Sequence, residues 1–417
     1  MRKTGILSLA SMLVINAAAA SSSWQLEKVV EIDRHSVRPP TVSNQKAMEA
    51  GSDRRWPAWQ TAAGELTAHG YQAAVNHGRY AGESARESGM LADGCPDADA
   101  VYIRASPLQR TRATAEALAE GAFPGCKVPV HVASGYDPLF QSEHLSAAAL
   151  DPHKVHRATL QAAGGDLNTL QHRLRADIAR LQQAVCQPGK PCPTFAQRWQ
   201  IEPGGDGRAS IRGLRDMADM AESIRLAWSN HNPLSEVAFG HVRSADDVAA
   251  LLPLLTINYD LTNDVPYIAQ RRGAVLLDQV SKALQSEATA NAPPATRWLV
   301  LVGHDTNIAY LRTLLGFHWQ LGNYPRGNIP PASRLVFERW RDMRSGDRFL
   351  RIYFQAQSLD QLRNLTPLNA QQPPLEQEFS PEGCEKREPG MLCPYSTMMT
   401  HLRAAVDNSA TTQVEYD

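Results

Sequence analysis

The sequence of 417 residues predicts an α/β protein, in which a mostly parallel sheet is flanked by helices and a mainly helical domain is inserted. Two observations lead to this prediction. Near both ends of the chain, apolar runs of strand length alternate with stretches of helix length, which is typical of a sheet covered by helices. Between residues 140 and 265, strand signals become scarce and apolar residues recur at spacings of three and four.

The first part of the α/β pattern contains three short runs that predict strands. These runs cover residues 26–33, 100–105 and 128–133. Residues 36–60 are rich in Pro, Ser, Asn and Trp and favour a long loop, whereas residues 67 to about 87 favour a helix. A second helix is expected to begin at Ser106. Ser106 can cap it, Pro107 suits its first position, and Gln109 completes a capping box.

The middle of the chain has the periodicity of helices. Apolar residues at spacings of three and four occupy residues 167–185 and 214–228, so each run predicts an amphipathic helix with one buried face. We therefore assign residues 139–265 to an inserted helical domain. The α/β domain then consists of residues 21–138 and 266–417.

Strand and helix patterns alternate again in the C-terminal part of the chain. A helix is expected at 275–284, and WLVLV at 298–302 is a continuous apolar run that predicts a strand buried on both faces. A polar cluster follows this strand, and a helix that ends at Gly316 comes next. Residues 335–340 and 349–354 are expected to pair as a hairpin.

Residues 1–20 have the features of a signal peptide. Arg2 and Lys3 give a positive start, residues 5–15 are mostly apolar but too short to span a bilayer, and the alanines at 18–20 form a small-residue cleavage site. A buried N-terminal helix is the alternative. We therefore expect a periplasmic or secreted protein that has no membrane association after cleavage.

Export fits the six cysteines of the chain. They fall as near neighbours along the sequence: Cys95 with Cys126, Cys186 with Cys192, and Cys384 with Cys393. Six cysteines allow many pairings, so the sequence does not fix one, although local pairing is favoured because each pair closes one loop. Six free buried thiols are the alternative, which an oxidising compartment disfavours.

The overall composition indicates which classes of binding partner the protein has. The chain is 43% hydrophobic and 20% charged, with a formal net charge of −1, as in an ordinary globular protein. Nothing in this balance favours nucleic acid or an anionic membrane surface. We expect a monomer that acts on a small molecule.

Polar clusters follow two of the predicted strands directly. Arg34, His35 and Arg38 come at the end of the first strand, and His304 and Asp305 come at the end of the apolar strand. Ligands of open α/β sheets bind at the carboxyl ends of the strands. We therefore expect the two clusters to face one site.

This set of side chains fits phosphoryl transfer. Converging arginines favour phosphate because their forked donors match its oxygens, and Arg110 adds a cation beside the helix start expected at Ser106. Nearby positive charge lowers the pKa of His35, which keeps a neutral nitrogen available for attack. Asp305 can protonate the leaving alcohol.

Simpler interpretations exist for two parts of this set. His304 and Asp305 alone are also typical of a helix cap, and Arg110 could be a surface arginine in the first turn of a helix. The sequence has no HExxH motif and no cysteine cluster of the kind that binds metal, so no metal or cofactor is expected.

At these residues the chain resembles the histidine acid phosphatases, in particular the bacterial periplasmic branch that contains phytases and glucose-1-phosphatases. The resemblance runs through nearly the whole mature chain. It rests on RHSVRPPT at 34–41, LQRTRATA at 108–115, AFPGC at 122–126, GHDTNIA at 303–309 and LVFERW at 335–340. It implies a phosphoglycerate-mutase-like α/β domain with an inserted helical domain, and no metal.

The same resemblance implies a role for each matching residue. His35 would be the nucleophile, and Asp305 would be the proton donor. The substrate would be bound by Arg34, Arg38, Arg110, His304, Thr41 and Arg272.

Two positions depart from the family pattern. Ser36 stands where the family often has Gly, and Val42 stands where similar bacterial phytases commonly have Lys. We expect an acid phosphomonoesterase that works through a covalent phosphohistidine, with phytate as its first expected substrate. A glucose-1-phosphatase or broad sugar phosphatase is the alternative, because Val42 offers no cation to a polyphosphorylated ring. A non-catalytic protein that binds phosphate esters is the hypothesis from a different class.

Overall fold

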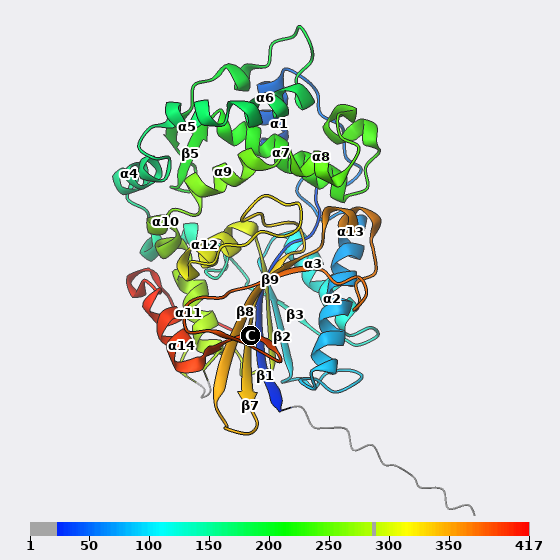
Figure 1. Ribbon diagram of the computed structural model, residues 1–417, viewed down its shortest axis with the longest axis vertical. Coiled ribbons are helices and arrows are strands. Elements are labelled where there is room, and N and C mark those ends of the chain that lie inside the picture. Colours follow the sequence, from blue (N-terminus) through cyan, green and yellow to red (C-terminus); the bar gives the residue numbers. More distant parts are fainter. Residues whose placement is uncertain (1–22, 286–288, 417) are drawn as a thin grey trace, which may run out of the picture.

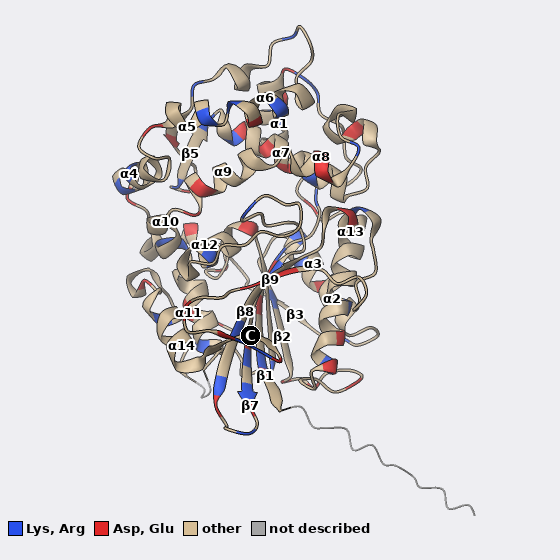
Figure 2. Ribbon diagram, viewed as in Figure 1, with Lys and Arg blue, Asp and Glu red and all other residues tan. Residues whose placement is uncertain are grey.

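The computed structural model describes residues 23–285 and 289–416, so the predicted signal peptide lies outside the described residues. The described chain forms a body built on one large sheet, with a helical part stacked at one end of that sheet (Figure 1). The predicted α/β fold class is confirmed. Lys, Arg, Asp and Glu are interspersed over both parts of the ribbon (Figure 2).

The large sheet of the described chain has nine strands in the order β10-β11-β8-β7-β1-β6-β2-β3, with β9 paired to β8. The strands are β1 (Trp24–Arg34), β2 (Val101–Ala105), β3 (Val130–Val132), β6 (Trp298–Gly303), β7 (Arg334–Asp342), β8 (Arg348–Ala356), β9 (Leu375–Glu378), β10 (Glu385–Arg387) and β11 (Gly390–Pro394). Strands β1, β6, β2 and β3 are mutually parallel. Strands β7, β9 and β11 run in the opposite direction, while β8 and β10 run with β1.

The register of the parallel strands brings their carboxyl ends level. Arg34 at the end of β1 lies opposite Gly303 at the end of β6, and Ala105 at the end of β2 lies opposite Val302. The residues that follow these strands therefore meet at one edge of the sheet. The strand predicted at 298–302 is buried as expected, and β7 and β8 form the predicted hairpin.

Helices cover the sheet of the body (Figure 1). They are α2 (Ala68–Glu87), α3 (Gln109–Ala122), α11 (Ala274–Ala283), α12 (Asp305–Leu315), α13 (Leu359–Asn364) and α14 (Tyr395–Ala404). Helices α2 and α3 approach each other very closely. A Cβ atom on Gly78 would lie 2.2 Å from the carbonyl oxygen of Leu118, and one on Gly121 would lie 2.1 Å from that of Val75. Glycine at both positions therefore permits this contact.

The helical part lies above the carboxyl end of the parallel strands (Figure 1). It contains α1 (Val42–Ser52), α4 (Pro152–Ala162), α5 (Leu167–Arg173), α6 (Arg175–Val185), α7 (Leu214–Ser229), α8 (Ala245–Ala249), α9 (Pro253–Thr262), α10 (Pro266–Arg272) and a hairpin of β4 (Gln200–Pro203) and β5 (Ala209–Arg212). Short 3-10 turns occupy Ser142–His144, Ser146–Ala148, Pro193–Ala196, Leu234–Gly240 and, near the C-terminus, Asn408–Ala410. The predicted boundaries of the inserted domain, 139–265, stay a prediction.

Two local predictions were wrong. The loop expected at 36–60 contains helix α1, whose N-cap is Thr41, and this helix packs against α7. The helix expected with Ser106 as its N-cap begins two residues later, because Leu108 is its N-cap and has no side-chain capping bond. The side chain of Gln109 accepts a hydrogen bond from the backbone of Leu66 at 2.9 Å instead of completing a capping box.

The local pairing of cysteines is confirmed. The structure contains the disulfides Cys95–Cys126, Cys186–Cys192 and Cys384–Cys393. In the described part of the chain, no helix combines the length and the apolar character that a membrane crossing requires.

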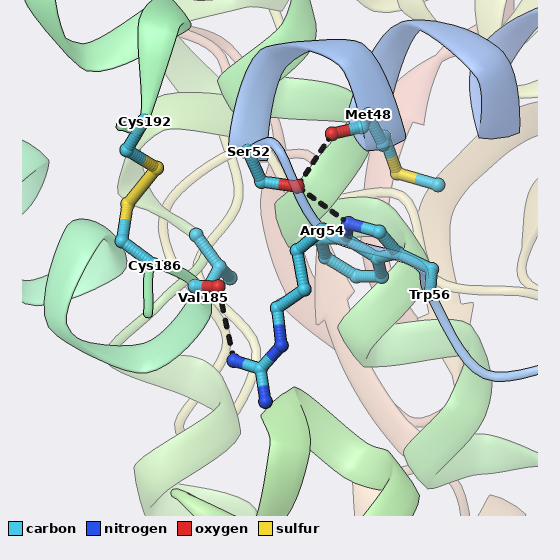
Figure 3. Close-up of a disulfide and its surroundings, with 7 residues drawn as sticks. All are labelled: Met48, Ser52, Arg54, Trp56, Val185, Cys186 and Cys192. Atoms are coloured by element: carbon cyan, nitrogen blue, oxygen red, sulfur yellow. Dashed lines mark hydrogen bonds between the residues drawn. A yellow bond between two sulfur atoms is a disulfide. The ribbon is translucent and has the colours of Figure 1, made fainter. Parts of the chain in front are cut away.

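One disulfide lies near the end of α1, within the helical part (Figure 3). The bond between Cys186 and Cys192 follows the end of α6, where the carbonyl oxygen of Val185 accepts a hydrogen bond from Arg54 at 3.2 Å (Figure 3). The guanidinium of Arg54 also lies 3.4 Å from the ring centre of Phe239. These contacts fasten the segment after α1 to the helices, and they help to hold the residues that follow β1 in place.

Candidate active site

His35 lies at the carboxyl end of β1 and is almost completely buried, with 1% of its surface exposed. Its backbone nitrogen donates to the carbonyl oxygen of Gly303 at 3.0 Å, and its own carbonyl oxygen accepts from Ala332 at 3.3 Å. Its Nδ1 lies 2.9 Å from the carbonyl oxygen of Ser36. A carbonyl oxygen can only accept, so Nδ1 carries the proton and Nε2 keeps its lone pair.

The surroundings of His35 keep its imidazole neutral. Burial, and then the positive charges of Arg110, Arg38 and Arg34, hold the pKa of His35 well below its ordinary value. A histidine in this setting stays unprotonated in mild acid. The lone pair on its Nε2 therefore stays available in mild acid.

Arg34 is fixed by groups on both sides of the site. Its guanidinium donates to the carbonyl oxygen of Ile329 and to the carboxylate of Glu222, and it lies 3.9 Å from Oδ2 of Asp305. Arg34 is buried, with 1% of its surface exposed, whereas the side chains of Glu222 and Asp305 are partly exposed. Its charge is therefore balanced by carboxylates before any ligand binds.

Arg38 and Arg110 retain open donors. Each makes one hydrogen bond to a carbonyl oxygen: Arg38 to Pro39 at 2.9 Å, and Arg110 to Gly64 at 3.3 Å. In the part of the chain that the structure describes, the buried Nε of each side chain has no partner. A buried guanidinium with unused N–H groups suits an anionic ligand, because an oxyanion would satisfy those groups.

His304 lies beside His35 and shares its neutral character. The two rings are 5.6 Å apart between centres and meet edge to face at 69°. Nε2 of His304 is 3.1 Å from the hydroxyl oxygen of Ser106. Burial, and then the charge of Arg110, lower the pKa of His304 to about 3. His304 is also the N-cap of α12, so its roles as helix cap and as site residue coexist.

Asp305 is the first residue of α12 and is held as a carboxylate. The hydroxyl group of Tyr259 donates a hydrogen bond to its Oδ2. Burial alone would raise the pKa of Asp305, but the charge of Arg34 and the hydrogen bond from Tyr259 outweigh burial and hold that pKa well below its ordinary value. A role as proton donor therefore requires something that raises this pKa, and a bound anion would do so.

The sequence analysis missed two residues of this site, and both come from the helical part. Glu222 on α7 accepts hydrogen bonds from Arg34 and from Arg225. Tyr259 on α9 binds Asp305. Neither residue belongs to a local motif, and Glu222 is separated from Arg34 by 188 positions, so nothing in the nearby sequence marks them.

Among the described residues, neither Thr41 nor Arg272 forms a hydrogen bond or an ion pair with another predicted site residue. The hydroxyl group of Thr41 donates to Oδ1 of Asn44 at 2.5 Å. Arg272 ends α10 and donates to the backbone carbonyl of Asp206, while its buried Nη1 has no partner among the described residues. The carboxylate of Asp206 binds Arg208 at 2.7 Å, so two arginines lie together there.

A sequence model of the histidine phosphatase superfamily (branch 2) matches residues 25–355. The chain belongs to this superfamily. Membership makes it a phosphoric monoester hydrolase, and the predicted family is confirmed.

Several relatives of this histidine phosphatase are similar over nearly their whole length. The solved structure of a phytase from Klebsiella sp. ASR1 is 51% identical, covers 94% of this chain and 98% of its own, and superposes with a TM-score of 0.91. Phytase AppA of Escherichia coli K12 is 32% identical over 93% of this chain and 94% of its own length. A glucose-1-phosphatase of Salmonella typhimurium is 30% identical over 91% and 92%, respectively.

Proposed function

We propose that this histidine phosphatase is a phytase that removes phosphate from myo-inositol hexakisphosphate through a covalent phosphohistidine. The observation that supports this mechanism is the neutral imidazole of His35. Its Nε2 keeps a lone pair beside the unused N–H donors of Arg38 and Arg110. The similarity to the Klebsiella phytase supports the choice of substrate.

In the first step, Nε2 of His35 attacks phosphorus, and the bond between phosphorus and the ester oxygen breaks. Arg38 and Arg110 bind the non-bridging oxygens with donors that are otherwise unused. Asp305 gives its proton to the departing ester oxygen, which leaves as an alcohol. The products of this step are the free alcohol and a phosphorylated His35.

Asp305 must gain a proton before it can give one. A bound phosphate brings negative charge to Asp305 and competes for the positive charge of Arg34, and both effects raise the pKa of this carboxyl group. In the second step, water attacks the phosphohistidine, and the Asp305 carboxylate takes the proton that the water loses. Inorganic phosphate then leaves, and His35 regains its lone pair.

Two arginines outside the reacting centre support a substrate with several phosphate groups. Arg272 has a buried Nη1 that has no partner among the described residues. Both arginines bind Asp206: Arg272 donates to its backbone carbonyl oxygen, and Arg208 donates to its carboxylate. Burial lowers the pKa of Arg208, but the negative charges around it, that of Asp305 among them, raise it overall. A ring with several phosphates has a second anionic group to place there.

A second candidate is a glucose-1-phosphatase or a broad sugar phosphatase. The observation that favours it is Val42, the first residue of α1, which is 58% exposed and offers no positive charge. The similarity to the Salmonella glucose-1-phosphatase supports the same alternative.

We also propose that the protein is exported to the periplasm or secreted. The basic and then apolar start of the sequence supports this proposal, and so do the three disulfides, which are typical of oxidising compartments. The monomeric state stays a prediction.

One comparison of turnover tests the proposed substrate. Initial rates of phosphate release at acidic pH should give a higher kcat/KM for phytate than for glucose 1-phosphate. The reverse order would favour the sugar phosphatase. Binding of phytate without any phosphate release from either ester would contradict both and favour a non-catalytic binding protein.

A further inference from the structure

Helix α7 places three carboxyl groups along the face that meets the phosphate-binding residues. Asp216, Asp219 and Glu222 follow one another at spacings of three, so they lie on one side of the helix. Glu222 is used by Arg34 and Arg225. The carboxyl group of Asp216 accepts from the hydroxyl group of Thr194 at 3.3 Å and pairs with Arg215. Asp219, between them, has no comparable partner.

Asp219 forms no ion pair within the described residues. Its Oδ1 accepts one hydrogen bond, from the side-chain amide of Asn44 at 2.8 Å, and its Oδ2 accepts none in the described chain. Asn44 in turn accepts from Thr41, which caps α1. Asp219 is therefore joined to the first turn of α1, directly after the segment that carries His35 and Arg38.

Asp219 lies about one turn of α7 before Glu222, which binds Arg34, and its hydrogen-bond partner Asn44 lies in the first turn of α1. Arg38 and Asp219 influence each other's pKa although they form no ion pair. A ligand group next to Asp219 would therefore be a neighbour of the reacting phosphate.

The charge of Asp219 changes within the range where a phosphatase works. Burial, and then the negative charges of Asp216 and Glu222, raise the pKa of Asp219 to about 7, while Arg215 and Arg38 oppose the rise. Below that pH the group is a neutral acid with one O–H donor. Above it, the group is an acceptor-only anion.

We propose that Asp219 is a specificity-determining residue of this phosphatase: its neutral carboxyl group donates a hydrogen bond to a second phosphate on a polyphosphorylated ring, and its ionised carboxylate repels that phosphate. The inference rests on the proposed function. It predicts that the preference for phytate over a monophosphate falls as the pH rises through the titration of Asp219.

The test compares kcat/KM for phytate with kcat/KM for p-nitrophenyl phosphate from about pH 5 to about pH 8, the range in which a carboxyl group with a pKa near 7 changes its charge. The ratio of the two constants is the readout, because it removes effects that are common to both esters. In wild type the ratio should fall above about pH 7. In Asp219→Asn the amide cannot ionise, so at about pH 8 the ratio should exceed that of wild type by about fivefold.

A neighbouring variant should move the ratio in the opposite direction. Asp216→Asn removes a negative charge that raises the pKa of Asp219, so its ratio should begin to fall at a lower pH than in wild type. The double variant should follow Asp219→Asn, since no titratable group remains at position 219. Asp177→Asn serves as a matched control, because Asp177 pairs with Arg180 on helix α6, and its ratio should follow wild type at every pH.

Two results would overturn the inference while leaving the proposed function intact. One is a wild type that hydrolyses phytate and a variant Asp219→Asn with the same ratio at about pH 8, where the wild-type carboxyl group is ionised. The other is an equal change in kcat/KM for both esters, which would show a structural role. A wild type that releases no phosphate from phytate at any pH would instead overturn the proposed function.

Discussion

The carboxyl end of the sheet and the helical part meet at one site, and they contribute different kinds of side chain to it. The strand ends supply His35, Arg38 and His304, whose neighbours are set by the register of β1 and β6. The helical part supplies Glu222 and Tyr259, which contact Arg34 and Asp305 and adjust their charge. The sheet thus positions the reacting groups, and the helices set the electrostatic conditions in which they react.

The largest effect is expected at the sheet. His35→Ala removes the nitrogen that we assign as the nucleophile, so turnover of phytate and of p-nitrophenyl phosphate should both fall by about 10⁵-fold. Thermal unfolding of the variant serves as the control for folding. Appreciable phosphate release by a folded His35→Ala protein would contradict the phosphohistidine and with it the assignment of chemistry to the strand end.

The next largest effect concerns the proton donor. Asp305→Asn should slow phytate by about 10²-fold to 10⁴-fold, because its alcohol leaves poorly without a proton. The same change should affect p-nitrophenyl phosphate much less, since nitrophenolate leaves without protonation. Equal losses on the two esters, measured as kcat, would argue that Asp305 acts by positioning and not by proton transfer.

The difference between the two regions also explains what the sequence could predict. Strand β6 is a continuous apolar run that ends in His304 and Asp305, so the pattern marks both the strand and the site residues after it. Helix α1 was missed because Pro, Trp and Asn around it favour a loop, whereas its N-cap Thr41 and its packing on α7 stabilise a helix. Tertiary contacts therefore stabilise helix α1 although the local composition favours a loop.

Glu222 shows why the helical half of the site could not be predicted. The periodicity of 214–228 predicts the helix and its buried face correctly. A carboxylate in that helix resembles any solvated charge in sequence, because its partner Arg34 lies 188 positions away. The helical insert was predicted from its spacing, but its contribution to the charge of the site depends on how the two regions are placed together.

A change in Glu222 should test whether the sheet residues depend on the helices. Glu222→Gln removes the carboxylate that pairs with the buried Arg225 and one of the two carboxylates beside the buried Arg34. The free energy of unfolding should fall by about 3 kcal/mol, measured by chemical denaturation. We expect kcat/KM to fall by about tenfold, since Arg34 loses the partner that holds it. As a matched control, Glu236→Gln changes a carboxylate of the helical part that forms no ion pair within the described residues. An unchanged stability of Glu222→Gln would mean that the strand end holds its arginines without the helices.

The smallest effect should come from Tyr259, which adjusts the pKa of the proton donor without taking part in the reaction. Tyr259→Phe removes the hydrogen bond that favours the ionised form of Asp305, so the pKa of Asp305 should rise. Because the donor must be protonated, the alkaline limb of the kcat profile with phytate should move up by about half a pH unit. The same pKa change affects the stability of the fold. A carboxyl group whose pKa is lowered by folding stabilises the folded state at pH values above the ordinary pKa of Asp. The variant should therefore lose stability at neutral pH and lose less of it in acid. An upward shift of the acid limb, with the alkaline limb unchanged, would instead show that Asp305 works as a base in the limiting step, and the helices would then assist the second step of the reaction instead of opposing the first.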